Sequence, residues 1–388
     1  MEQQQTYDVC HLTLLNAALH SRIFYKEALS AKQGGLRVCV IGQDAATAAY
    51  EKQGVRIIPL RIGMRRWVMH WHLLIRALRV QAKVYHIHTP ELLPLALVLW
   101  VLKRAQVVYD VHEDYAKNLM YGHAYTQSPL VRKMAAIAVR ALEKLSRLWV
   151  SYFLYAESCY SNMLGAASGK HAVLPNYYAP PTVVPALGGA EALPEHMPII
   201  GYMGTIAKDW GILETLSIWK TLNHQGSTGV FLLITGYGYD AKLVGHVQQV
   251  LEEANLPGRW RLVGGSMSVP YEKLISYMQA CTCISALYTP TLAIHERIPT
   301  KFYEAMTMQK PVLFTRNPTW DALNTRLNFG LSLDIADLQT AAGIVHDALQ
   351  DGFKNCYPAP LSPNAYAWDT VAPILMHAYT KLLKPRAA

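Results

Sequence analysis

The sequence contains few charged residues and no hydrophobic run of membrane-spanning length. Only 16% of its 388 residues are Asp, Glu, Lys or Arg, and 52% are hydrophobic, a composition that excludes a disordered chain. The longest apolar stretch, Leu92–Leu102, is shorter than the roughly 20 residues that a transmembrane helix needs. The N-terminus also lacks the apolar segment of a secretory signal. We therefore expect an ordered, cytoplasmic protein.

Cysteine is also scarce. Six cysteines are scattered along the chain, and four of them stand in apolar runs, a placement typical of buried free thiols in a reducing compartment. Cys281 and Cys283 form a C-x-C pair without a second pair, so we expect no zinc site there. No D-x-D triplet occurs, so a metal-bridged diphosphate is not indicated.

Basic residues outnumber acidic ones, 36 to 27, which gives a formal net charge of +9. Such an excess favours a partner rich in phosphate: a nucleic acid, an anionic membrane or a nucleotide. The charge alone does not choose among them. We expect no nucleic-acid partner, because no recognised module and no basic, aromatic groove is present.

The length predicts two domains, and the pattern of the chain repeats accordingly. Apolar β-branched runs alternate with helical stretches, which is typical of parallel sheets covered by helices. The predicted strands are Val9–Leu15, Arg37–Ile41, Arg56–Ile58, Val84–Ile87, Val107–Asp110, Leu148–Phe153 and Ala172–Leu174, then Ile199–Met203, Val230–Thr235, Arg261–Val263, Thr282–Ala286 and Val312–Phe314. A proline-rich segment, 176–198, interrupts the pattern. We predict one Rossmann-like domain over 1–180, joined by a closing helix at 370–388, and a second over 181–369.

Two glutamates eight residues apart carry the clearest chemical signal. Glu304 lies one turn inside a helix that Pro299 and Thr300 are expected to open, and Glu296 precedes that helix. A helix N-terminus offers free N–H groups to a pyrophosphate, while a carboxylate one turn later can bind a pair of ribose hydroxyls. The alternative is that Glu304 simply faces solvent.

Several further stretches accompany this motif in a specific order. They are His20-Ser21-Arg22 with Lys26-Glu27-Ala28, His86–Pro94, Val107–Glu113, Leu174-Pro175-Asn176 and Gly201–Ile206, with a looser match at Leu233–Gly238. Together with the two glutamates, they resemble the retaining family 4 glycosyltransferases, which have the GT-B fold and an E-x7-E motif. The resemblance covers most of the chain. It implies two Rossmann-like, doubly wound domains, a nucleotide diphosphate sugar as donor, and a glycan or lipid-linked acceptor.

The resemblance also implies roles for individual residues. His112, Glu296 and Lys208 are the expected catalytic residues; Glu304, Thr300, Ile298, Lys301, Arg297, Gly204, Thr205 and Gly236 are expected on the nucleotide sugar; and Arg22, His88 and Glu91 are expected on the acceptor side. Cations that stabilise the departing diphosphate contribute most to this kind of catalysis. The family requires no cofactor and no metal, although His86, His88 and His112 form a conceivable metal site.

Three departures from the family pattern bear on donor binding. Thr205 stands where many relatives have an arginine, and Pro299 removes an N–H that would face the donor. The glycine-rich loop near the first strand is missing, with Leu15-Asn16-Ala17-Ala18 in its place. A nucleotide-sugar 2-epimerase of GT-B architecture and a non-catalytic sugar- or lipid-binding relative therefore stay open as alternatives.

The helical stretch around Trp67–Arg79 has two interpretations. Trp67, Trp71, Leu74 and Leu78 recur at helical spacing, with arginines beside them. Such a helix either packs on its sheet with the arginines in water or docks on an anionic membrane. Docking would place the protein peripherally on the inner face of the plasma membrane and would suit a lipid-linked acceptor.

Overall fold

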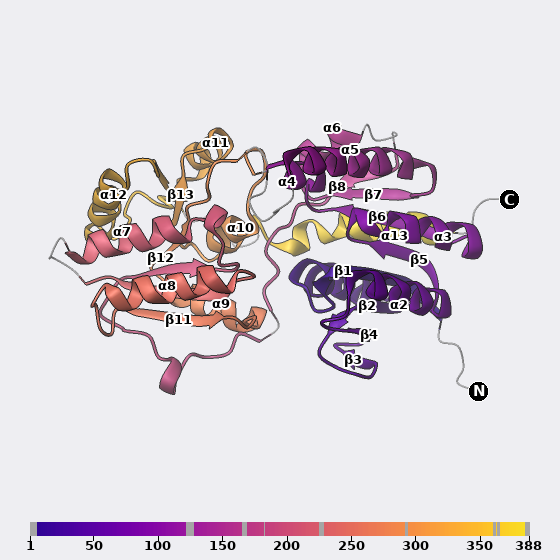
Figure 1. Ribbon diagram of the computed structural model, residues 1–388, viewed down its shortest axis with the longest axis horizontal. Helices are drawn as coiled ribbons and strands as arrows, with labels where there is room; N and C mark the ends of the chain where they lie inside the picture. The colour runs from indigo at the N-terminus through magenta and orange to yellow at the C-terminus, as the bar shows by residue number, and fades with distance from the viewer. Residues whose placement is uncertain are drawn as a thin grey trace. The chain divides into compact units, whose positions relative to one another are not determined.

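The computed structural model describes residues 6–121, 128–164, 169–181, 183–224, 229–291, 294–359, 362 and 365–384. The chain forms two compact units (Figure 1): the first comprises Met1–Ala179 and Trp368–Ala388, and the second comprises Pro180–Ala367. The sequence predicts this division at 180/181 and 369/370. Each unit is a sheet of mainly parallel strands covered by helices on both faces, so the predicted fold class is confirmed.

The first unit contains an eight-stranded sheet within its described residues, in the order β3-β4-β2-β1-β5-β6-β7-β8. Its strands are β1 (Thr6–Ala17), β2 (Val38–Asp44), β3 (Tyr50–Lys52), β4 (Val55–Arg61), β5 (Gln81–Ile87), β6 (Gln106–Val111), β7 (Tyr152–Tyr155) and β8 (His171–Val173). Its helices are a π-helix (Ser21–Ala28), α1 (Leu29–Gln33), α2 (Arg66–Arg79), α3 (Leu93–Lys103), α4 (Tyr115–Tyr121), α5 (Pro129–Leu145), α6 (Ser158–Leu164) and α13 (Ala372–Leu383). Among the strands that the structure describes in this unit, only β3 runs antiparallel to its neighbour.

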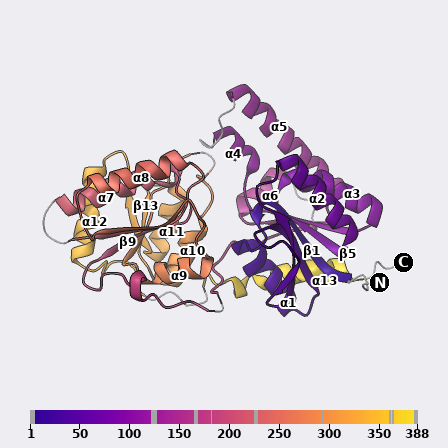
Figure 2. The same ribbon diagram turned by 60° about the horizontal axis from the view of Figure 1, so that its bottom comes forward.

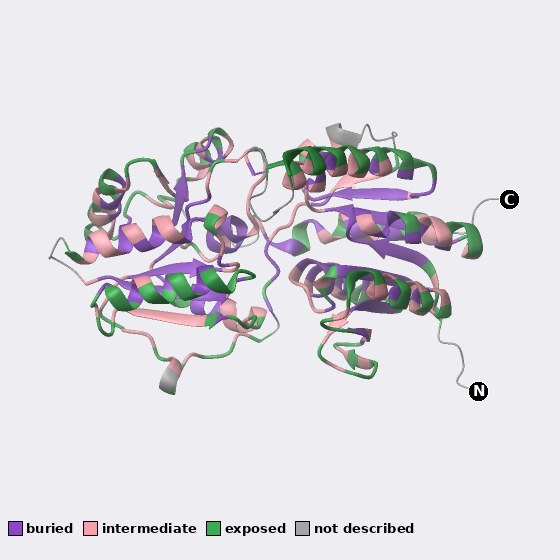
Figure 3. Ribbon diagram, in the orientation of Figure 1, coloured by how far each residue is buried: buried purple, intermediate pink, exposed green. Residues whose placement is uncertain are grey.

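The two faces of this sheet bury different sets of side chains. Alternate residues of β1 point to opposite faces: Cys10 packs with α2 and α3, whereas Val9 packs with the π-helix, α1 and α13. Most residues of the central strands β1, β2, β6 and β7 are therefore apolar and buried, as Figure 3 shows. Helix α13 belongs to this unit and packs against α1 and β5. Residues 385–388 of the predicted closing helix lie outside the described residues.

The second unit contains a six-stranded parallel sheet within its described residues, in the order β11-β10-β9-β12-β13-β14. Its strands are β9 (Ile199–Met203), β10 (Phe231–Tyr237), β11 (Trp260–Gly265), β12 (Cys283–Ala286), β13 (Val312–Thr315) and β14 (Gly330–Leu333). Its helices are α7 (Ile212–His224), α8 (Ala241–Glu253), α9 (Tyr271–Ala280), α10 (Thr300–Thr307), α11 (Pro318–Leu327) and α12 (Leu338–Gln350). Helices α7 and α8 cover one face of the sheet, and α9 and α10 cover the other (Figure 2).

The strand predictions differ from the structure in three places. The sequence analysis missed the edge strands β3 and β14, which are short and partly exposed. It also placed a strand at Leu148–Phe153, but Ser146–Leu148 forms a 3₁₀ turn and β7 begins at Tyr152. In the described residues, no helix is both long enough and apolar enough to span a membrane.

Candidate functional site

Helix α10 carries Glu304 into the interior of the second unit. The helix begins at Thr300, directly after Pro299, whose φ of −58° suits a position at a helix start. Glu304 is only 7% exposed, and its Oε1 accepts a hydrogen bond of 3.1 Å from the Tyr271 hydroxyl on α9. Of the two interpretations that the sequence allowed, the structure therefore rules out a solvent-facing Glu304.

Lys301 on the same helix is a buried cation. Its side chain is 8% exposed, and its Nζ lies 5.1 Å from the ring centre of Tyr202 and 5.3 Å from that of Tyr288. Within the described residues this ammonium has no hydrogen-bond acceptor. Burial lowers the pKa of Lys301 to about 8, and the nearby Glu304 carboxylate partly opposes that shift. An anion placed here would meet a cation that no carboxylate neutralises through a hydrogen bond.

The segment before α10 accepts hydrogen bonds from side chains at the start of α11. The Trp320 indole donates to the Arg297 carbonyl at 2.8 Å, and the Asn317 amide donates to the His295 carbonyl at 3.3 Å. Glu296 is exposed in this segment, while Arg297 is half-buried. Ile298 and Thr300 are also half-buried. The two glutamates of the motif therefore differ in setting, one at the surface and one inside.

Two glycines bring the loops after β9 and β10 into close approach. A Cβ atom on Gly236 would lie 1.6 Å from the Gly204 carbonyl oxygen, and Gly204 itself has a φ of +100°. Neither position tolerates a side chain. Thr205 follows at this edge, and Lys208 is exposed in a short 3₁₀ turn (Lys208–Trp210). Because Lys301 reaches Tyr202 near the end of β9, the Gly204 loop and α10 border the same edge of the sheet.

The first unit has its own cluster of polar groups, centred on Asp110 at the end of β6. Arg22 binds both carboxylate oxygens, at 2.8 Å from Nε to Oδ2 and 2.7 Å from Nη2 to Oδ1. The Nδ1 atoms of His88 and His112 each lie 3.3 Å from Oδ2. Burial acts to raise the pKa of Asp110, but Arg22 and the two histidines outweigh it and hold that pKa well below its usual range.

The predicted acceptor-side residues differ in accessibility. Arg22 is 1% exposed and His88 is fully buried, so a contact with an acceptor would have to be indirect for both. Glu91 is half-buried, and its Oε2 accepts a hydrogen bond of 2.8 Å from Arg66 Nε. His112 is 11% exposed, and its Nε2 lies 3.3 Å from the Tyr115 hydroxyl. Of these residues and Asp110, His112 and Glu91 are therefore the ones that extend toward the surface.

Sequence reasoning assigned no site role to several residues that the fold brings into these clusters. His11 lies beside His86 because β1 pairs with β5, which are separated by three strands in the sequence. Tyr202 of β9 and Tyr288, which follows β12, enclose Lys301. These contacts depend on which strands lie side by side in the sheet, and that order has no signature in the local sequence.

No family model matches the sequence, and no curated protein matches it either. Solved structures do match. Sucrose-phosphate synthase of Thermosynechococcus elongatus superimposes with a TM-score of 0.67 at 16% identity, over 97% of this chain and 98% of that one. HepE of Anabaena, solved in complex with UDP-glucose, superimposes with a TM-score of 0.67 at 12% identity, over 97% of this chain and 100% of that one. Trehalose 6-phosphate synthase of Burkholderia multivorans superimposes with a TM-score of 0.64 at 10% identity, over 97% of this chain and 99% of that one.

The chain has the GT-B fold. Each of these structures covers nearly the whole chain, so the likeness includes both units. At these identities it establishes the architecture, while the chemistry must be argued from this chain's own residues.

Proposed function

We propose that this protein is a retaining glycosyltransferase of family 4, which transfers a hexosyl unit from a nucleotide diphosphate sugar without a metal ion on the diphosphate. The observation that carries the proposal is the pairing of a buried carboxylate, Glu304, with a buried ammonium, Lys301, on the first turns of α10. This pair suits a ligand that joins a diol to an anion, as a nucleoside diphosphate does. The GT-B fold of the chain, shared with the glycosyltransferases named above, supports the same class of ligand.

In this proposal Glu304 accepts hydrogen bonds from the two ribose hydroxyls, and Tyr271 holds its carboxylate in place. The diphosphate lies at the start of α10, near the amides of Ile298 and Thr300, with Lys301 as its main cation. Arg297 and the exposed Lys208 supply further positive charge. These groups stabilise the charge that develops on the leaving diphosphate.

The transferred sugar is assigned to Glu296 and His112. Glu296 hydrogen-bonds its hydroxyls. Gly236 packs against the Gly204 carbonyl, while no atom lies within 4 Å of the place where a Cβ on Gly204 would stand, so a ligand can approach the backbone there, beside Thr205. His112, whose Nδ1 lies 3.3 Å from Asp110 Oδ2, is the further polar group that we assign to the sugar. No residue is assigned as a covalent nucleophile, so the donor phosphate accepts the acceptor's proton.

A thermal-shift panel of UDP-, GDP- and ADP-sugars tests the proposal. A donor that binds only the folded chain raises its melting temperature, by an amount set by its concentration relative to Kd. We expect one nucleotide series to produce a shift, with the free nucleoside diphosphate active and the free sugar inactive. No shift across the panel contradicts the proposal and favours a non-catalytic relative. A reaction that inverts a ring carbon of the nucleotide sugar, with no sugar transferred to an acceptor, indicates the epimerase.

The buried Lys301 predicts how donor binding depends on pH. The Lys301 ammonium is charged below its pKa of about 8, and a bound diphosphate favours that charged form. Above this pH, binding must therefore take up a proton, and affinity should fall by up to about tenfold per pH unit. Calorimetry on both sides of about pH 8 measures the slope.

Two variants serve as reference for that slope. Lys301→Met removes the titrating amine. This variant should bind the donor weakly, and its affinity should depend little on pH in this range. Lys242→Met changes an exposed lysine on α8 and should behave like the wild type. An unchanged slope in Lys301→Met assigns the proton uptake to another group and contradicts the role of Lys301.

For the acceptor we propose a glycan or lipid-linked molecule, met by a cytoplasmic protein at the inner face of the plasma membrane. Helix α2 supports this because it is not fully covered by its domain. Leu73 and Ala77 are buried against the core, whereas Trp67 and Trp71 are 63% and 60% exposed. Exposed arginines, Arg65, Arg66 and Arg79, accompany the two indoles. Indoles beside cations are typical of helices that lie on anionic lipid.

Vesicle co-sedimentation tests the α2 surface. Trp67→Ala and Trp71→Ala should each reduce binding to anionic vesicles by about tenfold, the loss expected for removing one large apolar side chain from the interface. Tyr239→Ala, which changes an 82% exposed aromatic residue of the second unit, is the matched control and should have no effect. Equal binding to neutral and anionic vesicles contradicts this part of the proposal.

A further inference from the structure

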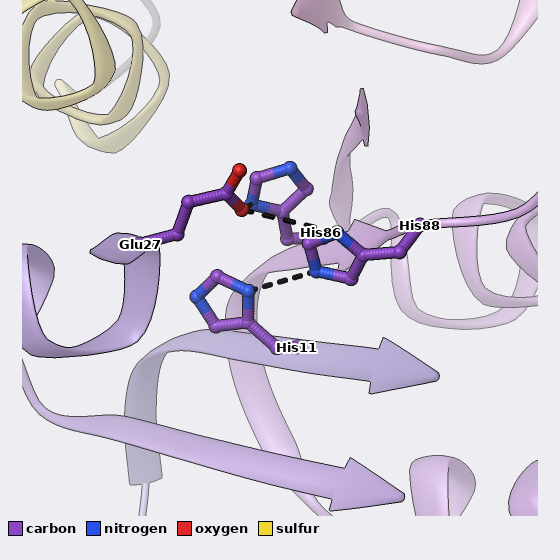
Figure 4. Close-up of side chains that lie close together, drawn as sticks. All are labelled: His11, Glu27, His86 and His88. Carbon is purple, nitrogen blue, oxygen red and sulfur yellow. Dashed lines mark hydrogen bonds and ion pairs between the residues drawn. The ribbon is translucent and has the colours of Figure 1, made fainter. Parts of the chain in front are cut away.

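Three histidines and a glutamate converge inside the first unit (Figure 4). His11 comes from β1, His86 from β5, His88 from the position directly after β5, and Glu27 from the π-helix. The sheet register pairs His11 with His86, and the two-residue period of a strand puts His88 on the same face as His86. All four side chains are fully buried. The fold thus assembles three imidazoles and one carboxylate from three separate segments.

The four side chains are close enough to share one ion. Each offers a ligand atom, and these atoms all lie within 4.8 Å of one another. Four points so spaced all lie within about 2.9 Å of a common centre, so each atom needs to move by roughly 0.9 Å at most to reach the 2.0–2.1 Å of a zinc bond. Rotations of side chains suffice for movements of this size. The closest contact in the group is 3.0 Å, between His11 Nδ1 and His88 Nε2.

The chemistry of the cluster favours a cation. Burial lowers the pKa of all three imidazoles, which keeps their nitrogen lone pairs available as ligands. Glu27 and Asp110 are two buried carboxylates that share the Arg22 guanidinium. Within the described residues neither oxygen of Glu27 receives a hydrogen bond, and His86 Nε2 has no partner. A proton or a metal ion on Glu27 would relieve this, since a buried polar atom without a hydrogen bond is costly even beside the Arg22 cation.

We propose that His11, Glu27, His86 and His88 bind one divalent transition-metal ion, with zinc as the ion that three imidazoles and one carboxylate suit best. Four protein ligands close a tetrahedral site, which is typical of structural zinc. The surrounding groups fit this assignment. Tyr379 of α13 places its hydroxyl 2.7 Å from His86 Nδ1, and Asp110 Oδ2 lies 3.3 Å from His88 Nδ1, as outer partners that orient metal-bound histidines do.

A second group, His88, Asp110 and His112, is a weaker candidate for the same ion. Its ligand atoms are also close together. However, both oxygens of Asp110 already bind the Arg22 guanidinium, whereas for Glu27 the ion pair with Arg22, of 3.0 Å, is to Oε1. The ion in the proposed site therefore joins β1, β5 and the π-helix, and its role is to stabilise the first unit. It is independent of Glu304 and Lys301, the residues proposed to bind the nucleotide, which belong to the second unit.

Metal analysis of the tag-free, full-length protein tests the proposal. We expect about one zinc ion per chain, as four ligands from one chain imply, in protein refolded from denaturant with zinc. Removal of zinc by a chelator should lower the melting temperature, and zinc should restore it. Cobalt bound in place of zinc should show the visible absorption of a four-coordinate site. Refolded protein that holds no zinc, and whose melting temperature responds to neither chelator nor zinc, overturns the proposal and leaves a proton on Glu27.

Variants locate the ion. His86→Gln and Glu27→Gln, with folding verified by circular dichroism, should each lose the zinc and the cobalt absorption. His112→Ala tests the second group and should retain both, as should His246→Ala, which changes an exposed histidine on α8. Zinc retained in both His86→Gln and Glu27→Gln overturns the assignment. If these variants do not fold, the chelator experiment on the wild-type protein decides whether the ion binds, because it needs no substitution.

Discussion

Arg22→Met is expected to destabilise the protein by about 3–5 kcal/mol, the cost of leaving a buried charge without its partner. The Arg22 guanidinium is 1% exposed and pairs with the fully buried Asp110 and Glu27. Methionine fills a similar volume but supplies no charge and no donors. Asp110 would then be left with His88 and His112 as its neighbours. Urea unfolding followed by circular dichroism measures the loss.

The pH dependence of this loss identifies its cause. Asp110 has a lowered pKa in the wild type, so its contribution to stability is present above the ordinary carboxyl pKa of 3.8 and fades as pH falls through its folded pKa. Without Arg22 the carboxyl can take up a proton more readily, so the gap between variant and wild type should narrow as the pH is lowered toward 3.8. Arg37→Met is the matched control, because Arg37 is 58% exposed and 3.7 Å from Asp8. It should cost no more than about 1 kcal/mol. An equal loss in both variants contradicts the buried network.

Glu304→Ala is expected to weaken donor binding by roughly 30- to 150-fold, or about 2–3 kcal/mol, since hydrogen bonds to a buried charged group contribute at this level. The Glu304 carboxylate is 7% exposed and held by Tyr271. Alanine removes the acceptor for both ribose hydroxyls and leaves the Lys301 ammonium without its nearest carboxylate. Calorimetry with the nucleotide sugar that gives the largest thermal shift measures the change.

Three companion variants separate binding from folding. Glu304→Gln keeps the shape and one acceptor and should lose less affinity than Glu304→Ala. Tyr271→Phe removes only the supporting hydroxyl and should lose less again. Glu253→Ala alters an exposed glutamate on α8 and should bind normally. Unchanged donor affinity in a folded Glu304→Ala protein contradicts the ribose role.

Much of the architecture follows from local patterns in the sequence. Parallel strands that are covered on both faces are apolar throughout, so runs such as Val38–Ile41 and Val312–Phe314 can be recognised as strands from the sequence. The strands β3 and β14 were missed because they are three and four residues long and contain Glu51 and Lys52 or Gly330 and Ser332, so neither forms an apolar run. The shifted start of β7 has a different reason: Leu148 is apolar but 74% exposed in a 3₁₀ turn.

The sequence by itself determined the alternation of strands and helices, the proline-rich boundary and the position of Glu304 one turn inside a helix, because these depend on residues close together in the chain. Tertiary structure decided which side chains meet. It placed His11 beside His86, buried Arg22 between two carboxylates, and enclosed Lys301 between Tyr202 and Tyr288. Such contacts depend on strand order and register. Burial then sets the charge of each group, so the electrostatics of the site arises only when distant segments pack together.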